Sequence, residues 1–487
     1  MSESASVPFS ETKAPEAPER LHRGALSLID ISASTMANIG PAYSFYFSFG
    51  FLVFTAGIAA PLTILAAGIA VALLGNTLAQ FSRAHPSTGG FITFVGKTFG
   101  GTSAVTTALL CGAGYIIAIS SVLAISGGFV SMTLQYYFNW NVPWIIFSVL
   151  LTGGAVVMML RGVGVSTRLA GLFFGFEMLV LVIVSVVALI KNGSHLSLAP
   201  FDPHHITNGF SGLAAGFPLA VYLFIGWENS AALAEETSNP RRNVPRAVYL
   251  SVAMMLVGYL LFAYATVSGF ANNGTKLAAA PIPFITVAHS SLAALAVFAY
   301  LAGLTSTMGV LIAACNSQAR LIFNAGREGL LPRWIGRVQA PRQTPRNALF
   351  LFVGVAGAII VVWALGHLIG GHGNSMNPLD FFDDSGTMGT ILVLVVYFLA
   401  NLALPFYYRR YRPSEFSVIK HAVLPVLGMI AVGIPMYYLV KPGQAAPLDW
   451  FPYAALAIIV LSVLYSLWLV RRDPGVGDRV GSIVADE

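Results

Sequence analysis

Residues 212–246 contain an apolar run long enough to enter a lipid bilayer, yet Ile225-Gly226-Trp227 interrupts it and Glu228 follows at membrane depth. Backbone groups released from a helix are tolerated at that depth only where protein or a water-filled cavity satisfies them. A charged side chain there costs about 2.5–3.5 kcal/mol on insertion scales. A lipid-facing helix gains nothing from either feature, so the segment predicts half of a solute-binding site inside a membrane protein.

The composition places the whole chain in the membrane class. Hydrophobic residues make up 56% of the sequence and charged residues 9%, whereas soluble domains carry about 25% charged residues. A helix needs about 20 apolar residues to cross a bilayer. We therefore expect an all-α integral membrane protein with twelve transmembrane helices, at about 27–52, 56–81, 102–133, 143–160, 168–190, 211–236, 246–270, 292–319, 346–366, 387–408, 421–440 and 450–470.

The basic residues predict an orientation for these helices. With twelve spans, all of the 26 Lys and Arg residues except Lys191, Lys276 and Lys441 fall on the side of the N-terminus or at helix ends on that side. Cytoplasmic loops carry such an excess. We expect a multi-pass protein of the plasma (inner) membrane with cytoplasmic N- and C-termini, and the net charge of +6 then indicates no nucleic-acid partner.

The chain is expected to have one membrane domain with short tails. Residues 1–22 lack an apolar core, so they predict a flexible cytosolic tail and no cleavable signal peptide. The twelve-helix transporter domain is assigned to 23–472 and a cytosolic C-terminal tail to 473–487. Tails of this length leave little room for the signalling domain that a receptor usually appends.

Cysteine and histidine predict neither a metal site nor a cofactor. Cys111 and Cys315 fall inside predicted helices, where they are expected to act as small packing residues. His204, His205, His367 and His372 fall in predicted outer loops without a plausible ligand set.

The first apolar segment has an interruption of its own, at Asn38-Ile39-Gly40-Pro41-Ala42. Proline removes a backbone donor and clashes with the preceding turn, and the adjacent glycine loosens the helix further. Interrupted helices at matching positions of two halves point to a substrate site in secondary transporters. The alternative is a simple proline kink. We favour a functional break, because the first helix begins the first group of five helices and the sixth helix begins the second group.

Three motifs resemble those of the amino acid–polyamine–organocation (APC) transporter family. Residues 224–247 are similar to F-x-G-[FV]-E followed by E-E-x-x-x-P-x-x-x-[IV]-P-[RK]-[AS]. Residues 86–100 resemble P-S-x-G-G followed by an aromatic residue and F-G, and residues 319–332 resemble S-R-x-x-x-x-M-A-R-D-G-x-L-P. The resemblance implies the leucine-transporter-type fold, a 5+5 inverted repeat with broken helices 1 and 6. Repeat one would cover about 27–190, repeat two about 211–408, and helices 11 and 12 about 421–470.

Two positions depart from the family pattern. The break in the first helix lacks the G-x-G of many amino acid transporters, which puts detailed carboxylate contacts in doubt. In the fifth helix, Glu177 stands at about the position where some members carry a lysine near the unwound first helix. A lysine-based coupling mechanism should therefore not be transferred to this chain.

The two breaks suggest complementary roles in substrate binding. Free N–H groups around the first break suit a substrate carboxylate, and carbonyls near the second break suit an ammonium group. Tyr222 is a candidate gating aromatic that could cover the substrate, or a packing residue. The predicted substrate-binding set is Asn38, Ile39, Gly40, Pro41, Ala42, Tyr222, Phe224, Ile225, Gly226 and Trp227.

Buried carboxyl groups are the candidates for ion coupling. Glu228 could carry a proton through the transport cycle or tie two helices together, and Glu177 has the same chemistry. Ser306 and Thr307 could supply oxygens to a sodium site, although small hydroxyls also pack helices. The aspartates Asp380, Asp383 and Asp384 are expected in a solvated outer loop.

The sequence thus favours a secondary-active symporter that imports an amino acid or related amine by alternating access. Proton coupling is favoured over sodium, because two carboxyl groups are present and no convincing cation cage is visible. An exchanger, or a polyamine importer without proton coupling, remains an alternative, and a membrane receptor is the alternative outside transport. No nucleophile–base pair or metal set indicates an enzyme. The choice of amino acid or amine and the oligomeric state stay open.

Overall fold

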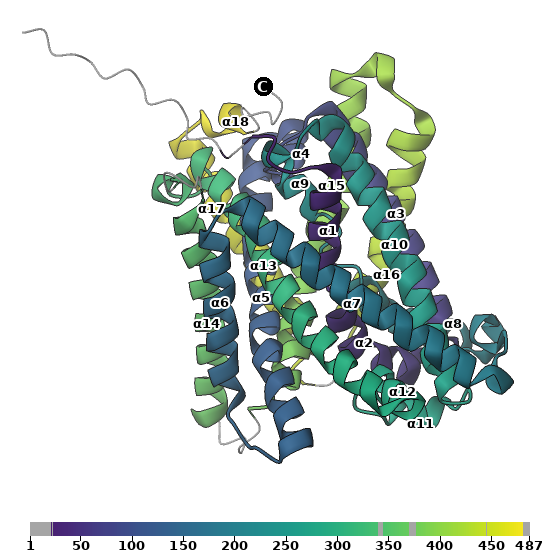
Figure 1. The fold of residues 1–487 in the computed structure, drawn as a ribbon. Coiled ribbons are helices and arrows are strands. Elements are labelled where there is room, and N and C mark those ends of the chain that lie inside the picture. Colours follow the sequence, from purple (N-terminus) through teal and green to yellow (C-terminus); the bar gives the residue numbers. More distant parts are fainter. Residues whose placement is uncertain (1–20, 22, 339–343, 370–375, 445, 481–487) are drawn as a thin grey trace, which may run out of the picture.

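A computed structural model describes residues 21, 23–338, 344–369, 376–444 and 446–480. Within these ranges the protein is built from helices and loops, without a named β-strand. Figure 1 shows a bundle of long helices with α4, α9 and α18 at its upper end and α11 and α12 at its lower end. We call these the upper end and the lower end of the bundle.

In the part of the chain that the structure describes, the bundle contains thirteen helices of twelve or more residues and several short ones. The long helices are α1 (Leu28–Ile39), α2 (Pro41–Ala56), α3 (Ala60–Ala84), α5 (Gly101–Phe138), α6 (Trp144–Leu160), α7 (Val163–Lys191), α8 (Gly209–Tyr222), α10 (Pro240–Gly269), α13 (Ala293–Arg327), α14 (Arg346–Ile369), α15 (Pro378–Tyr411), α16 (Leu424–Val440) and α17 (Phe451–Arg472). The short helices are α4 (Phe91–Phe99), α9 (Asn229–Ala232), α11 (Gly274–Ala278), α12 (Pro283–Ser291) and α18 (Val476–Arg479).

Each predicted span coincides with one of these helices or helix pairs. In the described residues, nine helical stretches are long and apolar enough to cross a membrane, and α6 and α8 are shorter apolar helices. The first stretch, Leu28–Ala84, includes two predicted spans because the helices from α1 to α3 follow one another with hardly a loop. The model is therefore an all-helical membrane fold, as the composition indicates.

One boundary differs enough to change an interpretation. The helix predicted at 387–408 is α15, which already begins at Pro378. The Asn377 side chain accepts a hydrogen bond from Leu379 N at 3.1 Å, and proline at the first helical position fits the helix without losing a needed donor. The prediction that Asp380, Asp383 and Asp384 form a loop is wrong, because this cap places them in the first turns of α15.

Central and peripheral helices differ in what they expose. The most apolar windows of α5 and α15 are 67% buried, whereas that of α17 is 17% buried. Exposed leucines, valines and tryptophans on α14, α16 and α17 form a surface suited to lipid. The two helix breaks therefore lie in a core surrounded by better-exposed helices.

Parts of both predicted tails contact the bundle. Leu21, the one described residue of 1–22, is buried. Residues 473–480 contain α18, whose Val476 is buried, as is Val480. Residues 1–20, 22 and 481–487 of the predicted tails, and His372, lie outside the described residues.

Candidate functional site

The first apolar segment breaks at Gly40, between α1 and α2. Gly40 adopts φ +62°, a left-handed conformation that side chains disfavour. A Cβ atom at this residue would lie 2.2 Å from the Val310 Cγ2 atom of α13. Glycine is therefore required both by the turn and by the close approach of α13.

The second break lies between α8 and α9, over residues 223–228. Gly226 adopts φ +106°, and a Cβ atom there would lie 2.8 Å from Asn38 Nδ2 and 3.0 Å from Asn38 C. Asn38 Nδ2 donates a hydrogen bond to the Gly226 carbonyl at 3.3 Å. The two breaks thus contact each other directly, and Gly226 makes that contact possible.

At the first break, the backbone donors of α2 already have partners. Ala42 N donates to Glu177 Oε2 at 3.0 Å, Tyr43 N to Ser306 Oγ at 2.9 Å, and Ser44 N to the Gly40 carbonyl at 2.7 Å. Pro41 has no N–H to offer. The groups that the sequence assigns to a substrate carboxylate are therefore occupied by the protein itself.

At the second break, most carbonyls are also paired. Tyr259 donates its hydroxyl to the Leu223 carbonyl at 2.8 Å, and Trp227 N donates to the Phe224 carbonyl at 3.2 Å. The Ile225 carbonyl accepts no hydrogen bond from the described residues. Ile225 is one of the residues that line the cavity described next.

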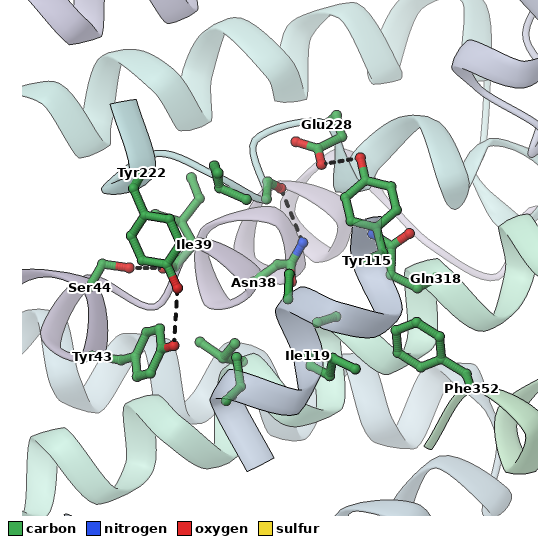
Figure 2. Close-up of a pocket in the computed structure, with 16 residues that line it drawn as sticks. Asn38, Ile39, Tyr43, Ser44, Tyr115, Ile119, Tyr222, Glu228, Gln318 and Phe352 are labelled. Atoms are coloured by element: carbon green, nitrogen blue, oxygen red, sulfur yellow. Dashed lines mark hydrogen bonds between the residues drawn. The ribbon is translucent and has the colours of Figure 1, made fainter. Parts of the chain in front are cut away.

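A cavity lies between the two breaks and is shown in Figure 2. Its lining comes from both breaks and from α5, α13 and α14: Asn38, Ile39, Tyr43, Ser44, Tyr115, Ala118, Ile119, Val122, Tyr222, Ile225, Gly226, Glu228, Val310, Ala314, Gln318 and Phe352. Apolar and aromatic side chains dominate, with a few polar groups, as is typical of small-molecule sites.

Glu228 is the one acidic residue of this lining. Tyr115 donates its hydroxyl to Glu228 Oε1 at 2.7 Å, and Tyr397 also lies beside the carboxyl group. Glu228 Oε2 is buried and has no hydrogen-bond partner among the described residues. A buried acceptor that faces a cavity in this way is suited to bind a proton or a cationic ligand.

The structure places one part of the predicted binding set in the cavity lining and the other part outside it. Asn38, Ile39, Tyr222, Ile225 and Gly226 line the cavity together with Glu228. The other predicted residues lie around the cavity rather than in its lining: Gly40, Pro41, Ala42, Phe224, Trp227, Glu177, Ser306 and Thr307.

Phe224 and Trp227 pack in the core. The Phe224 ring meets that of Tyr259 edge-on at 5.3 Å between centroids. The Trp227 ring lies 5.5 Å from that of Tyr397 and 6.2 Å from that of Phe91. Both side chains therefore pack in the core beside the second break and do not line the cavity.

The predicted sodium ligands differ in their surroundings. Ser306 Oγ accepts from Tyr43 N beside the first break, whereas Thr307 Oγ1 donates to the Leu304 carbonyl of its own helix at 2.9 Å. Glu177 Oε1 is buried and unpartnered among the described residues. No cluster of three His, Cys, Asp or Glu side chains suited to a metal ion occurs in the described ranges.

Sequence reasoning missed the contribution of α5, α13 and α14. Gln318 is a polar residue inside a helix long enough to cross a membrane, and this feature could have identified it. Tyr115 and Phe352 carry no comparable sign, because aromatic residues are common in membrane helices. Only the packing of α5 and α14 against the breaks brings them to the cavity.

Three aromatic rings border the cavity toward the lower end. The Tyr43 and Tyr222 hydroxyls lie 3.4 Å apart, as Figure 2 shows. The Phe382 ring lies 5.6 Å from that of Tyr43 and 5.9 Å from that of Tyr222, edge-on to both. We call Tyr43, Tyr222 and Phe382 the aromatic lid. A second pocket, lined in part by Phe382 and Asp383, lies against the lid.

Two buried ion pairs close the upper end. Arg320 pairs with Glu236 and also donates to the Asn316 carbonyl at 2.6 Å. Arg327 pairs with Glu235 at 2.9 Å. We call these four charged residues the ionic seal.

The segment before α1 adds backbone bonds to the ionic seal. Leu26 N donates to the Glu236 carbonyl, and Ser238 N donates to the Leu26 carbonyl, both at 2.9 Å. Leu21 N donates to Glu235 Oε1 at 2.8 Å. The chain before the first helix is thereby bound to the loop that follows the second break.

The three sequence motifs converge at this seal. Glu235 N donates to Thr88 Oγ1 of the loop after α3 at 3.3 Å, and the arginines of the seal come from the end of α13. Each of the three motifs that carry the family resemblance thus contributes residues that hold the upper end together.

The family model for amino acid permeases matches residues 24–477. The chain belongs to the amino acid permease family. Its match covers nearly all of the helices described above, so this permease is a transporter of the APC family and not an enzyme.

Curated relatives of this permease carry several transport functions. Asc-type amino acid transporter 1 of Mus musculus is 25% identical over 85% of this chain and 80% of its own length. The branched-chain amino acid permease BcaP of Bacillus subtilis is 22% identical, and the methylthioribose transporter of the same bacterium 23%. Each of these two alignments covers 85% of this chain and 86% of the relative.

Solved structures show the same fold. A crystal structure of the manganese transporter of Eremococcus coleocola matches with a TM-score of 0.54 at 11% identity, over 91% of this chain and 95% of that one. Identity this low speaks to the fold alone, and the fold is that of transporters of the leucine-transporter type.

Proposed function

We propose that this permease imports an amino acid or related amine across the plasma membrane by alternating access, coupled to protons. The observation that carries the proposal is the cavity between two touching helix breaks, with a buried carboxyl group in its lining. Substrate sites of secondary transporters lie near the bilayer midplane between discontinuous helices. The lid below and the seal above supply the two gates that alternating access requires.

The proposal includes a topology. The upper end faces the cytoplasm with both termini, because Lys191, Lys276 and Lys441 belong to the opposite side and the other basic residues to this one. Twelve crossings satisfy this arrangement, with α1 and α2 forming the first and α8 and α9 the sixth. The helices of 27–190 and 211–408 then form two inverted repeats.

Proton coupling is assigned to Glu228, with Glu177 as a second candidate. Glu228 lies in the cavity with one oxygen free of partners among the described residues. Sodium coupling has weaker support, because Thr307 bonds to its own helix. An exchanger that uses the same cavity without a proton is the alternative, and the test below separates the two.

The test is uptake into proteoliposomes of a labelled panel. It contains neutral, aromatic, basic and acidic amino acids and the corresponding amines, each with and without an inward proton gradient at fixed sodium. Concentrative uptake of one class that collapses with the gradient supports the proposal. Uptake that requires a preloaded internal solute and ignores the gradient identifies an exchanger instead.

Glu228→Gln tests the coupling residue. The amide keeps the size of the side chain and an acceptor for Tyr115, but it cannot carry the proton. We expect gradient-driven uptake to be lost while exchange between internal and external substrate persists. Glu415→Gln serves as the matched control, because Glu415 is exposed and far along the chain on the loop after α15. Unaltered gradient dependence in Glu228→Gln would remove Glu228 from the mechanism.

Gly226→Ala tests the contact between the two breaks. Residues at positive φ are costly for side chains, about 1–3 kcal/mol, and the added Cβ meets Asn38. We expect lower thermal stability and loss of substrate binding. Gly175→Ala in α7 is the control, because no atom lies within 4 Å of its added Cβ. Normal binding by Gly226→Ala would show that the contact is dispensable.

A further inference from the structure

The N-terminus of α2 is a natural anion site that a carboxyl group of the protein already fills. Free N–H groups and the helix dipole favour negative charge at such a terminus. Here the carboxyl group of Glu177 accepts from Ala42 N at 3.0 Å. Glu177 comes from α7, 135 residues along the chain, and its side chain is fully buried.

The remaining donors of this turn are not free for a second anion. Tyr43 N is bonded to Ser306 Oγ and Ser44 N to the Gly40 carbonyl. A substrate carboxylate that approached the first break would find these donors occupied and would approach the oxygens of Glu177.

The cavity itself offers no cationic substitute for these donors. Its described lining contains Glu228 but no lysine, arginine or histidine. A buried carboxylate without a cation or sufficient donors is strongly disfavoured. A zwitterionic amino acid would therefore leave its carboxylate poorly satisfied, whatever its ammonium group bound.

An ammonium group, in contrast, finds several partners. Glu228 Oε2 and the Ile225 carbonyl are acceptors without partners among the described residues. The rings of Tyr115, Tyr222 and Phe352 line the same cavity, and aromatic faces attract cations. Figure 2 shows Glu228 and Tyr115 together at one end of the cavity and Tyr222 at the other.

We propose that the substrate is a cationic amine without an α-carboxylate, because Glu177 and Ser306 occupy the backbone donors at which an amino acid would bind its carboxylate. The ammonium group binds as a hydrogen-bond donor at Glu228, whose carboxyl group can accept in its protonated form as well, and a compact apolar body contacts Val122, Val310 and Phe352. This inference rests on the proposed transport function and specifies its substrate class.

The experiment compares matched pairs on purified, reconstituted wild-type protein. Isoamylamine is compared with leucine, phenethylamine with phenylalanine, and ethanolamine with serine, in thermal shift and in uptake. Leucine methyl ester adds a compound that keeps the ammonium group and masks the carboxylate. We expect at least one amine to bind about tenfold or more tightly than its amino acid, which corresponds to about 1.4 kcal/mol. The ester should follow the amine.

The outcomes separate this inference from the transport proposal. Uptake of amino acids with equal or higher affinity than the matched amines overturns the inference and leaves transport intact. Failure of every compound to be transported, with gradient and with preloading, contradicts the transport proposal as well. Uptake of amines without matching amino acid uptake supports both.

Glu177→Gln tests the cause of the selectivity. Glutamine keeps an acceptor for Ala42 N but cannot carry a negative charge. We expect the preference for isoamylamine over leucine to decrease severalfold in this variant. Ser306→Ala, which frees Tyr43 N without changing charge, should decrease it less. An unchanged preference in Glu177→Gln, with a folded protein by thermal shift, contradicts the assigned role of Glu177.

Discussion

The two ends of the cavity are closed by different interactions. At the upper end the ionic seal pairs arginines from α13 with Glu235 and Glu236, and all four side chains are buried. At the lower end the aromatic lid brings together rings from α2, α8 and α15. Breaking a buried ion pair leaves an uncompensated charge, whereas rings can separate one contact at a time.

This difference has an energetic consequence for the transport cycle. Removing one partner of a buried pair costs about 3–5 kcal/mol, and an aromatic pair contributes about 0.5–1.5 kcal/mol beyond its area. We therefore expect that opening the lower end costs less free energy than opening the upper end. When the upper end opens, both partners of each ion pair lose their buried contact at the same time. Water that enters, or a movement driven by the substrate, then has to solvate both of them.

The largest effect is expected from Arg320→Ala. It leaves Glu236 buried without its cation, which should lower the free energy of unfolding by about 3–5 kcal/mol. Thermal unfolding in detergent checks this. Glu415→Ala is the control, since its exposed pair with Arg412 contributes about 0–1 kcal/mol. A loss no larger than that of the control would show that the seal does not hold the upper end.

A smaller effect is expected from Phe382→Leu. Leucine keeps an apolar side chain but loses the edge-on contacts with Tyr43 and Tyr222, each worth about 0.5–1.5 kcal/mol. Phe54→Leu, at an exposed residue of α2, should leave stability nearly unchanged. If Phe382→Leu destabilised the protein more than Arg320→Ala, the proposed order of the two ends would be reversed.

Tyr43→Phe should have a still smaller effect on stability. The hydroxyl contact with Tyr222 measures 3.4 Å, which is long for a hydrogen bond between hydroxyls. The ring contacts with Phe382 remain, so we expect a change of about 0.5–1 kcal/mol at most. Uptake kinetics and unfolding measured together check this, and a loss comparable to that of Phe382→Leu would make the hydroxyl the main element of the lid.

The smallest effect is expected outside the membrane-spanning helices, at Asp473. Hydrogen bonding by Arg479 lowers the pKa of this carboxyl group below its usual value. A lowered folded-state pKa gives stability that is present above the unfolded-state pKa and lost as pH falls through the folded-state value. Asp473 therefore adds slightly to the stability at neutral pH, and this contribution is lost in acid. We expect Asp473→Asn to remove this small pH dependence, which thermal unfolding at several pH values measures. An effect at neutral pH equal to that of Arg320→Ala would contradict the ranking.

The helices were predictable because their main determinant is local. An apolar run of sufficient length has to be helical in lipid, and each predicted span coincides with a helix. The breaks at Gly40 and Gly226 were predictable for the same reason, since glycine and proline act on the chain near them. The start of α15 was missed because Asn377 and Pro378 cap the helix in a way that average hydropathy does not detect.

The cavity lining was predicted only in part. Asn38, Tyr222 and Glu228 follow from the breaks, whereas Tyr115 and Gln318 come from helices distant in sequence. Phe224 and Trp227 lie beside the second break, but their rings point into packing contacts rather than the cavity. The sequence shows how many residues separate a side chain from a break. It does not show which side of the helix faces the cavity, because that depends on the neighbouring helices.

The sequence alone determined that this chain is a helical membrane transporter with two breaks and a carboxyl group at the second. These features follow from apolar length, from the backbone preferences of glycine and proline, and from the cost of charge in lipid. Only the tertiary structure decided that Glu177 fills the anion site of α2 and that Glu228 keeps a free oxygen in the cavity. Both facts depend on which side chains from distant parts of the chain pack around these carboxyl groups. Long-range packing determines this, and the local sequence does not.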